Sequence, residues 1–309
     1  MVNLQHQHCK QLKIPRAAYS VKLLKTSLFV FLLFSLQTVR SQSIPLPNAF
    51  AHNDYLHRHP LFDALANGYT NIEADIFLKS GRLIVAHVDP FFKKERTLET
   101  LYLKPLAERI AANNGSVYRG YDKPLILMID VKTDADNTYR ALKQLLEKYR
   151  PMFSSYNRGR VYGGAITVVL SGHKPFKMIK DEDSRLAFID EDLRQTYHDT
   201  TARNVYQMAS CKYSKLLSWR GDGPMPAVER QKLCTYVAEA HKYGKKVRLW
   251  ASPENDQVWA ELLKCGVDLI NTDQLARLKM FLINHPNGSL LTNAQAATPS
   301  APDTWSLNL

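Results

Sequence analysis

Cysteine and long hydrophobic runs are scarce in this sequence of 309 residues. Four cysteines are too few for the dense disulfide framework of a small secreted domain. The apolar run at residues 28–36 covers nine positions, far short of the roughly 20 that a membrane-spanning helix needs. No glycine-rich phosphate loop follows the first predicted strand, which disfavours an open dinucleotide-binding sheet. The chain therefore has to be stabilised by a hydrophobic core.

Acidic residues are absent from the first 25 positions, which carry five lysine or arginine residues. The apolar run at 28–36 and small residues before position 42 follow this basic stretch. Such an order is typical of a secretory signal peptide. We predict a signal peptide at residues 1–41 and an exported protein, either periplasmic or secreted.

The net charge of +12 overstates the charge of the mature chain. Without residues 1–41, 35 basic residues face 29 acidic residues, a net charge of +6. The remaining basic clusters, such as Lys245 and Lys246, are short and scattered, which is typical of solvated surfaces. We expect no nucleic-acid partner and a monomer, and weak contact with a membrane surface stays open.

Residues 42–286 have the length of one large α/β domain with a substantial core. Residues 287–309 are rich in Ser, Thr, Ala, Pro and Asn, which predicts a disordered tail. After the predicted cleavage, Cys211, Cys234 and Cys265 remain. An odd number allows one disulfide and one thiol, and the sequence does not choose the pair.

Short apolar segments alternate with helical patterns along the predicted domain. Eight of these segments are predicted strands, at 49–52, 72–78, 125–131, 165–171, 186–190, 215–218, 246–250 and 269–272. Continuous apolar strands indicate a parallel sheet buried on both faces. We predict a closed (β/α)8 TIM barrel, with an open doubly wound sheet as the alternative.

Chemically active side chains occur at or just after the ends of these strands, where TIM barrels carry their active sites. They are His52, Glu73, Asp75, His87, Asp130, Lys132 and Trp250. Strand side chains alternate, so Glu73 and Asp75 share one face, as do Asp130 and Lys132. Converging carboxylates raise one another's pKa unless a cation lies between them, and a divalent cation with oxygen ligands is the usual solution.

Two imidazoles beside such a site, from His52 and His87, suit acid/base cleavage of a phosphodiester. Trp250 would form a wall of the pocket and shares a strand face with Arg248, which could supply a further cation. The alternative for Asp130 and Lys132 is a simple ion pair.

The ordered set resembles the superfamily of glycerophosphodiester phosphodiesterases and phosphatidylinositol-specific phospholipases C, and also the spider-venom phospholipases D. The shared order is a first-strand His, E-x-D, a His about a dozen residues later, an acid-x-Lys and the string "CGVDLINTD". The segment "AHNDYLHRHPLFDALANG" is similar to a branch that includes altered inheritance of mitochondria protein 6. The resemblance covers about residues 51–282.

This resemblance implies a phospholipase-C-like phosphodiesterase barrel with one divalent cation, Mg²⁺ or Ca²⁺. Carried over by motif, the acid and base are His52 and His87, and the metal ligands are Glu73, Asp75 and Asp130. Lys132 and Trp250 would contact the substrate, a small-molecule or lipid-derived phosphodiester.

Two departures from the glycerophosphodiesterase pattern leave the substrate open. Asn53 and Asp54 follow His52 where those enzymes have Arg, and Asp130 stands where they have Glu. The string "DVKT" at 130–133 is closer to the venom phospholipases D. We predict a metal-dependent phosphoric diester hydrolase for glycerophosphodiesters or phospholipid head groups. The alternatives are an inactive barrel that binds phosphorylated or lipid ligands, a phospholipase-D-like lyase, and a metal-free glycosidase that uses two carboxylates.

Overall fold

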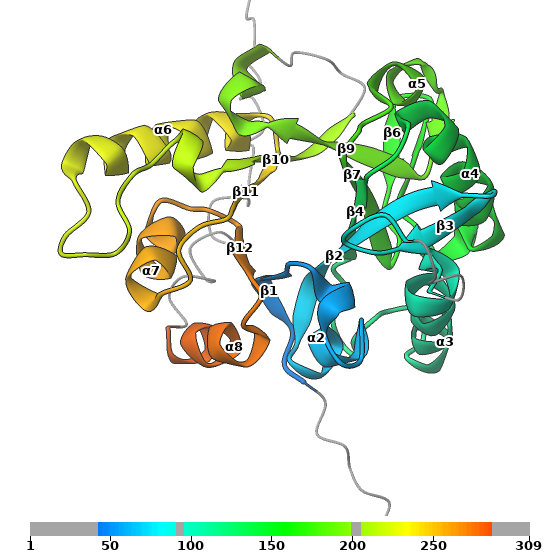
Figure 1. Ribbon diagram of the computed structural model, residues 1–309, viewed down its shortest axis with the longest axis horizontal. Coiled ribbons are helices and arrows are strands. Elements are labelled where there is room, and N and C mark those ends of the chain that lie inside the picture. Colours follow the sequence, from blue (N-terminus) through cyan, green and yellow to red (C-terminus); the bar gives the residue numbers. More distant parts are fainter. Residues whose placement is uncertain (1–42, 91–95, 199–204, 286–309) are drawn as a thin grey trace, which may run out of the picture. The chain divides into compact units, whose positions relative to one another are not determined.

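Parallel strands close into a barrel in the computed structural model, which describes residues 43–90, 96–198 and 205–285. Eight parallel strands of these residues follow the order β1-β12-β11-β10-β9-β7-β4-β2, and β1 also pairs with β2, which closes the ring. Figure 1 shows this ring with the helices outside it. The predicted TIM barrel is confirmed. The predicted signal peptide, 1–41, and tail, 287–309, lie outside the described residues.

The barrel strands are short, and most of them are buried along nearly their whole length. They are β1 (Leu46–Ala51), β2 (Tyr69–Lys79), β4 (Leu125–Val131), β7 (Ile166–Gly172), β9 (Ala187–Asp192), β10 (Tyr206–Lys212), β11 (Lys246–Trp250) and β12 (Leu269–Thr272). β3 (Arg82–Val85) pairs antiparallel with β2 and reverses the chain toward the barrel mouth. A separate small sheet contains β5 (Ser155–Asn157), β6 (Arg160–Tyr162) and β8 (Ser184–Arg185).

Helices follow most of the strands and cover the outside of the barrel (Figure 1). They are α2 (Phe62–Ala66), α3 (Lys104–Ala112), α4 (Ala135–Lys148), α5 (Phe176–Asp181), α6 (Ala227–Lys242), α7 (Asp256–Lys264) and α8 (Leu275–Asn284). Side-chain caps begin two of them, because Asp134 accepts a hydrogen bond from the Asn137 amide and Asn255 accepts one from the Val258 amide. Within the described ranges, no helix has both the length and the apolar character needed to cross a membrane.

The sixth barrel strand is not where the sequence analysis predicted it. Residues 215–218 follow β10 and lie in a helical turn and an irregular segment, whereas β10 itself is Tyr206–Lys212. Two inward positions of β10 carry Ser210 and Lys212 instead of apolar side chains, so the strand lacks a continuous apolar run. Trp219, which directly follows residues 215–218, is buried, does not line the cavity and donates its indole N–H to the Asp222 carbonyl.

Two apolar clusters stabilise the barrel. The larger one fills the space between the strands and the surrounding helices. The smaller one lies inside the barrel and consists of Phe50, Ile126, Met128, Val169, Met208 and Leu269. Five of these apolar residues are followed, two positions further along the chain, by a polar residue. The polar residues are His52 after Phe50, Asp130 after Met128, Ser171 after Val169, Ser210 after Met208 and Asn271 after Leu269. The barrel interior therefore changes from apolar to polar toward the carboxyl ends of the strands.

A disulfide joins Cys234 in α6 to Cys265, the residue after α7. Cys211 on β10 is a buried free thiol, and burial raises its pKa to about 11. The structure thus selects the pair that the sequence left open.

Candidate active site

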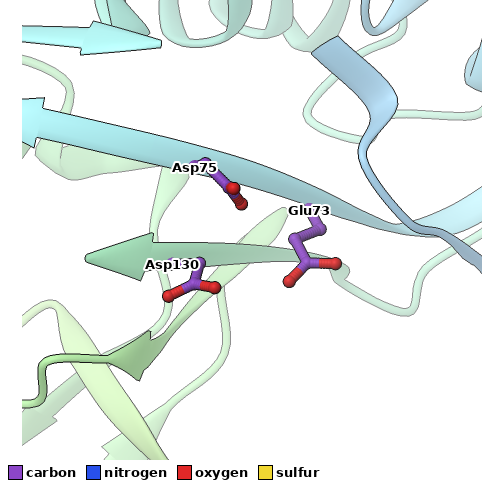
Figure 2. Close-up of side chains that lie close together, drawn as sticks. All are labelled: Glu73, Asp75 and Asp130. Carbon is purple, nitrogen blue, oxygen red and sulfur yellow. The ribbon is translucent and has the colours of Figure 1, made fainter. Parts of the chain in front are cut away.

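Three carboxylates converge at the carboxyl ends of β2 and β4. Asp75 and Asp130 are register partners across the two strands, and Glu73 lies one inward position before Asp75. One ligand oxygen from each of the three side chains lies within 4.8 Å of the others. Figure 2 shows the side chains reaching from neighbouring strands into the same space. The predicted carboxylate cluster is therefore present.

Burial makes this cluster costly without a cation. Glu73 and Asp75 are 4% and 2% exposed. Burial raises the pKa of Glu73, although Arg248 and His52 oppose the rise. Burial likewise raises the pKa of Asp75, against the opposing effects of a Tyr55 hydrogen bond and of Lys132. The ionised carboxylates are thus stable only with positive charge beside them.

Two side-chain cations supply part of that charge. Lys132 Nζ lies 2.7 Å from Asp130 Oδ2 and 3.0 Å from Asp75 Oδ2. Arg248 Nη1, from β11, lies 3.4 Å from Glu73 Oε2. The ion pair between Asp130 and Lys132, which the sequence analysis held as the alternative, therefore exists, and Lys132 also reaches Asp75.

The remaining oxygens test whether a divalent cation fits this site. Among the described residues, Asp130 Oδ1, Ser171 Oγ and Asp190 Oδ1 are buried without a hydrogen-bond partner, and all three residues line the same cavity. Gly172 has a φ of +69°, and a Cβ there would collide with the Asp130 carboxylate. Unsatisfied hard oxygens are the ligands that Mg²⁺ and Ca²⁺ prefer. The three acidic residues could thus bind a metal ion.

His52 follows β1 and lies beside Glu73. Its Nδ1 is 2.8 Å from Asp273 Oδ1, and its Nε2 is 3.8 Å from Glu73 Oε2. Burial lowers the pKa of His52, but the hydrogen bond to Asp273 and the charge of Glu73 outweigh burial, so the net pKa is raised. The hydrogen bond to His52 in turn lowers the pKa of Asp273. Asp273 therefore orients the ring and leaves Nε2 directed at the carboxylates.

His87 lies on the other side of the cluster, beside Asp75. Its Nδ1 is 3.6 Å from Asp75 Oδ2 and 3.0 Å from the Tyr55 hydroxyl. The Tyr55 hydroxyl also lies 2.7 Å from Asn53 Oδ1 and forms a hydrogen bond with Asp75. Tyr55 therefore connects the His87 ring to the residues around the carboxylates.

All seven predicted site residues line one cavity of about 540 Å³. Trp250, the last residue of β11, is 39% exposed at its rim. Lys132, on the opposite part of the rim, contacts two of the carboxylates as described above. The structure brings the predicted set together.

Several residues that contact the predicted site were not predicted. Asp273 directly follows the predicted strand at 269–272, so its position was available from the sequence, and Asn53 was considered only as a departure from the family pattern. No sequence pattern indicated Tyr55 as a site residue, because its contact with His87 depends on how β3 folds back along β2. Asp190, 5% exposed, lies at a strand end that the sequence did indicate.

A closed parallel barrel with acids and imidazoles at its carboxyl end is the arrangement that the sequence analysis predicted for a phosphodiesterase-type TIM barrel. Comparison with known proteins agrees with this class. Residues 38–190 match the AIM6-like phosphodiesterase domain, and residues 246–276 match the glycerophosphoryl diester phosphodiesterase family.

Individual relatives identify the branch. Altered inheritance of mitochondria protein 6 from Eremothecium gossypii is 30% identical over 277 residues, which cover 76% of this chain and 69% of that protein. The homolog from Arthroderma benhamiae is 26% identical over 265 residues, covering 76% of this chain and 83% of that protein. The chain belongs to the family of altered inheritance of mitochondria protein 6, within the glycerophosphodiester phosphodiesterase superfamily. Family and fold support a phosphodiesterase-type function.

A crystal structure of a glycerophosphodiester phosphodiesterase from Parabacteroides distasonis is also similar. The superposition has a TM-score of 0.47 and 11% sequence identity, and it covers 78% of this chain and 98% of that chain.

Proposed function

We propose that this protein is a metal-dependent phosphoric diester hydrolase that acts on glycerophosphodiesters or phospholipid head groups. The observation that carries the proposal is the convergence of Glu73, Asp75 and Asp130 within 4.8 Å. His52 and His87 contact this cluster at Glu73 and Asp75, so each carboxylate of β2 has an imidazole beside it.

A divalent cation held by Glu73, Asp75 and Asp130 would neutralise the charge that develops on the phosphate oxygens. One histidine, His52 or His87, removes a proton from the attacking water or substrate hydroxyl, and the other protonates the leaving alcohol. Asp273 keeps the His52 ring oriented, and Tyr55 does so for His87. Lys132 contacts the phosphate from the rim of the cavity.

The second candidate is an inactive barrel that binds a phosphorylated or lipid ligand. One observation favours it, because Lys132 already neutralises one oxygen of Asp75 and one of Asp130. The unpartnered Asp130 Oδ1 favours the enzyme, since it is left for a further cation.

Turnover of bis(p-nitrophenyl) phosphate with Mg²⁺ or Ca²⁺ tests the proposal. We expect hydrolysis that chelator abolishes and that Glu73→Gln removes. Glu239→Gln is the matched control, because Glu239 pairs with Lys242 on α6 and does not line the cavity. A folded protein that cleaves no phosphodiester with either ion would be the inactive barrel.

Product analysis separates a hydrolase from a lyase. Glycerophosphocholine, lysophospholipid and phosphatidylinositol would each give a phosphate monoester from a hydrolase. A neighbouring-hydroxyl nucleophile would give a cyclic phosphate instead, the outcome that the "DVKT" string favours.

We also propose that the protein is exported. The disulfide between Cys234 and Cys265 supports this, because disulfides persist in oxidising compartments. Detection of the protein in a periplasmic or culture fraction, with residues 1–41 removed, would test it.

A further inference from the structure

The cavity has two chemically distinct sides. The carboxylates lie on β2 and β4. On the other side, basic side chains line the same cavity from the next strands around the ring and the segments after them. They are Lys174 after β7, Arg194 after β9, Lys212 at the end of β10 and Lys215 in the helical turn that follows. β10 is three strand positions from β4 in the ring. A substrate phosphate beside the carboxylates therefore leaves these cations available to the rest of the substrate.

Two of the four cations already have partners. Arg194 Nη2 lies 2.6 Å from Asp192 Oδ2, and Lys174 Nζ donates to the Asp190 carbonyl at 2.7 Å. Within the described part of the chain, Lys212 and Lys215 form no ion pair with a carboxylate. Neither ammonium is therefore held by a direct carboxylate contact among the described residues.

Lys212 is held against Trp250. The two are register partners and the last residues of β10 and β11. Lys212 Nζ lies 5.6 Å from the centroid of the Trp250 ring, within range of a cation–π interaction. One level deeper in the barrel, their strand neighbours Ser210 and Arg248 are also register partners. The ammonium therefore stands at the rim, above the catalytic layer.

This arrangement discriminates between head groups by charge. Aromatic faces commonly recognise quaternary ammonium groups. Here Lys212 already occupies the Trp250 ring, so a choline group stacked there would meet a like charge. A negatively charged group would instead gain a charge-assisted hydrogen bond.

We propose that Lys212, held by Trp250 and accompanied by Lys215, binds a second anionic group on the substrate. That group is a carboxylate or a phosphate monoester on one of the alcohols of the phosphodiester. This inference rests on the proposed function and narrows its substrate class to phosphodiesters whose alcohol carries a further negative charge.

Two glycerophosphodiesters that differ in one group test the subsite. Glycerophosphoglycerol ends in a neutral CH₂OH, and glycerophosphoglycerate has a carboxylate at that position. We expect kcat/KM for the glycerate diester to exceed that for the glycerol diester by about tenfold, and glycerophosphocholine to be the poorest substrate. Lys212→Ala should lower kcat/KM for the glycerate diester by about tenfold and that for the glycerol diester by less than about twofold.

Matched variants separate the subsite from general electrostatics. Lys177→Ala removes an exposed lysine that pairs with Asp181 outside the cavity, and it should leave the preference unchanged. Lys212→Arg should retain the preference, and Lys212→Glu should reverse it. The 1-acyl forms of the same diesters show whether the source of the anionic alcohol is a lipid or a soluble molecule.

Failure of the subsite is distinguishable from failure of the proposed function. Hydrolysis without charge preference, or equal losses for both diesters in Lys212→Ala, would overturn the subsite and leave the hydrolase intact. If no diester is cleaved, the hydrolase is overturned. Calorimetric titration of the intact glycerate diester then tests the subsite alone, because weaker binding to Lys212→Ala supports it and equal binding refutes it.

Discussion

Asp75 and Asp130 are register partners in adjacent parallel strands, and the Lys132 ammonium joins their Oδ2 atoms. Parallel register places the two carboxylates side by side. They therefore repel each other unless a cation lies between them. Lys132 contacts one oxygen of each carboxylate, whereas Asp130 Oδ1 has no hydrogen-bond partner among the described residues. The pair is therefore arranged for one ammonium and one further cation.

Asp130→Asn should abolish stabilisation by metal. The substitution keeps the shape of the side chain and removes the charge that an ion needs. At a concentration of 100 Kd, Mg²⁺ or Ca²⁺ should stabilise the unaltered protein by about 2.7 kcal/mol, and the variant by much less. Thermal unfolding with metal or chelator, at constant ionic strength, measures the difference. Asp192→Asn, whose carboxylate pairs with Arg194 in the same cavity, should respond to metal normally. Equal gains for Asp130→Asn and the unaltered protein would exclude Asp130 as a ligand.

His52→Asn and His87→Asn should each lower kcat by about 10²–10⁴, with folding unchanged. Each ring lies beside a carboxylate of β2 and at the cavity surface, so its removal takes away an acid or base and little of the core. Initial rates with bis(p-nitrophenyl) phosphate and circular dichroism of the same samples measure both effects. His59→Asn is the control, because this exposed histidine pairs with Asp63 on α2. Rates close to normal for either site variant would show that its imidazole transfers no proton.

Asn53 should act as a positioning residue for both histidines. Its side chain hydrogen-bonds Asp273, the carboxylate that orients His52, and its Oδ1 accepts from the Tyr55 hydroxyl, which contacts His87. Its φ of 48° is left-handed, so Asn53→Gly keeps the backbone and removes only the amide. We expect kcat to fall by about 10- to 100-fold while KM stays within about twofold, because the rings lose their alignment.

Asn114→Gly is the matched control for Asn53→Gly, since Asn114 has a φ of 58° and lies outside the cavity. Unchanged kcat in Asn53→Gly, or a loss confined to KM, would contradict the positioning role.

The sequence predicted the parts of the barrel that are local in the chain. β4 is a continuous apolar run buried on both faces, so composition alone marks it. Glu73 and Asp75 share a face because alternation is a property of one strand. β10 was misplaced because its inward side chains Ser210 and Lys212 serve the cavity and interrupt the apolar pattern.

Contacts made by barrel closure could not be predicted in the same way. Asp273 reaches His52 only because β12 pairs with β1, more than 200 residues away in the chain. The Arg248 contact with Glu73 spans 175 residues and depends on the same closure. Strand periodicity contains no information about such partners, so their roles emerge only from the three-dimensional arrangement.

The disulfide should contribute about 3.7 kcal/mol to the free energy of unfolding. Cys234 and Cys265 are separated by 31 residues, and closing a loop of that length restricts the unfolded chain. Guanidinium unfolding of the Cys234→Ser/Cys265→Ser variant should show this loss, and dithiothreitol should destabilise the unaltered protein but not the variant. Cys211, buried with a pKa raised to about 11, should react with thiol reagents only after unfolding. Unaltered stability of the double variant would contradict the entropic contribution.

Asp54 should make stability depend on pH. The carboxyl group is fully buried beside the His52 loop, and its Oδ2 accepts from the Leu61 amide at 2.6 Å and the Tyr102 hydroxyl at 2.8 Å. Burial raises the pKa of Asp54 to about 6, from 3.8, even though both hydrogen bonds oppose the rise. The folded state therefore binds this proton more tightly than the unfolded state. The resulting stabilisation is complete below about pH 3.8 and is lost as pH rises through about 6.

Asp54→Asn removes this titration while the side-chain oxygen still accepts both hydrogen bonds. Relative to the variant, the unaltered protein should lose about 2.4 kcal/mol of unfolding free energy between pH 4 and pH 8, out of a full difference of about 3 kcal/mol at about 1.36 kcal/mol per pKa unit. Guanidinium unfolding of both proteins across this range measures the difference. Parallel pH profiles would mean that the pKa of Asp54 is the same in the folded and the unfolded protein. The cost of desolvating its carboxylate would then have to be offset by contacts within the loop that carries His52.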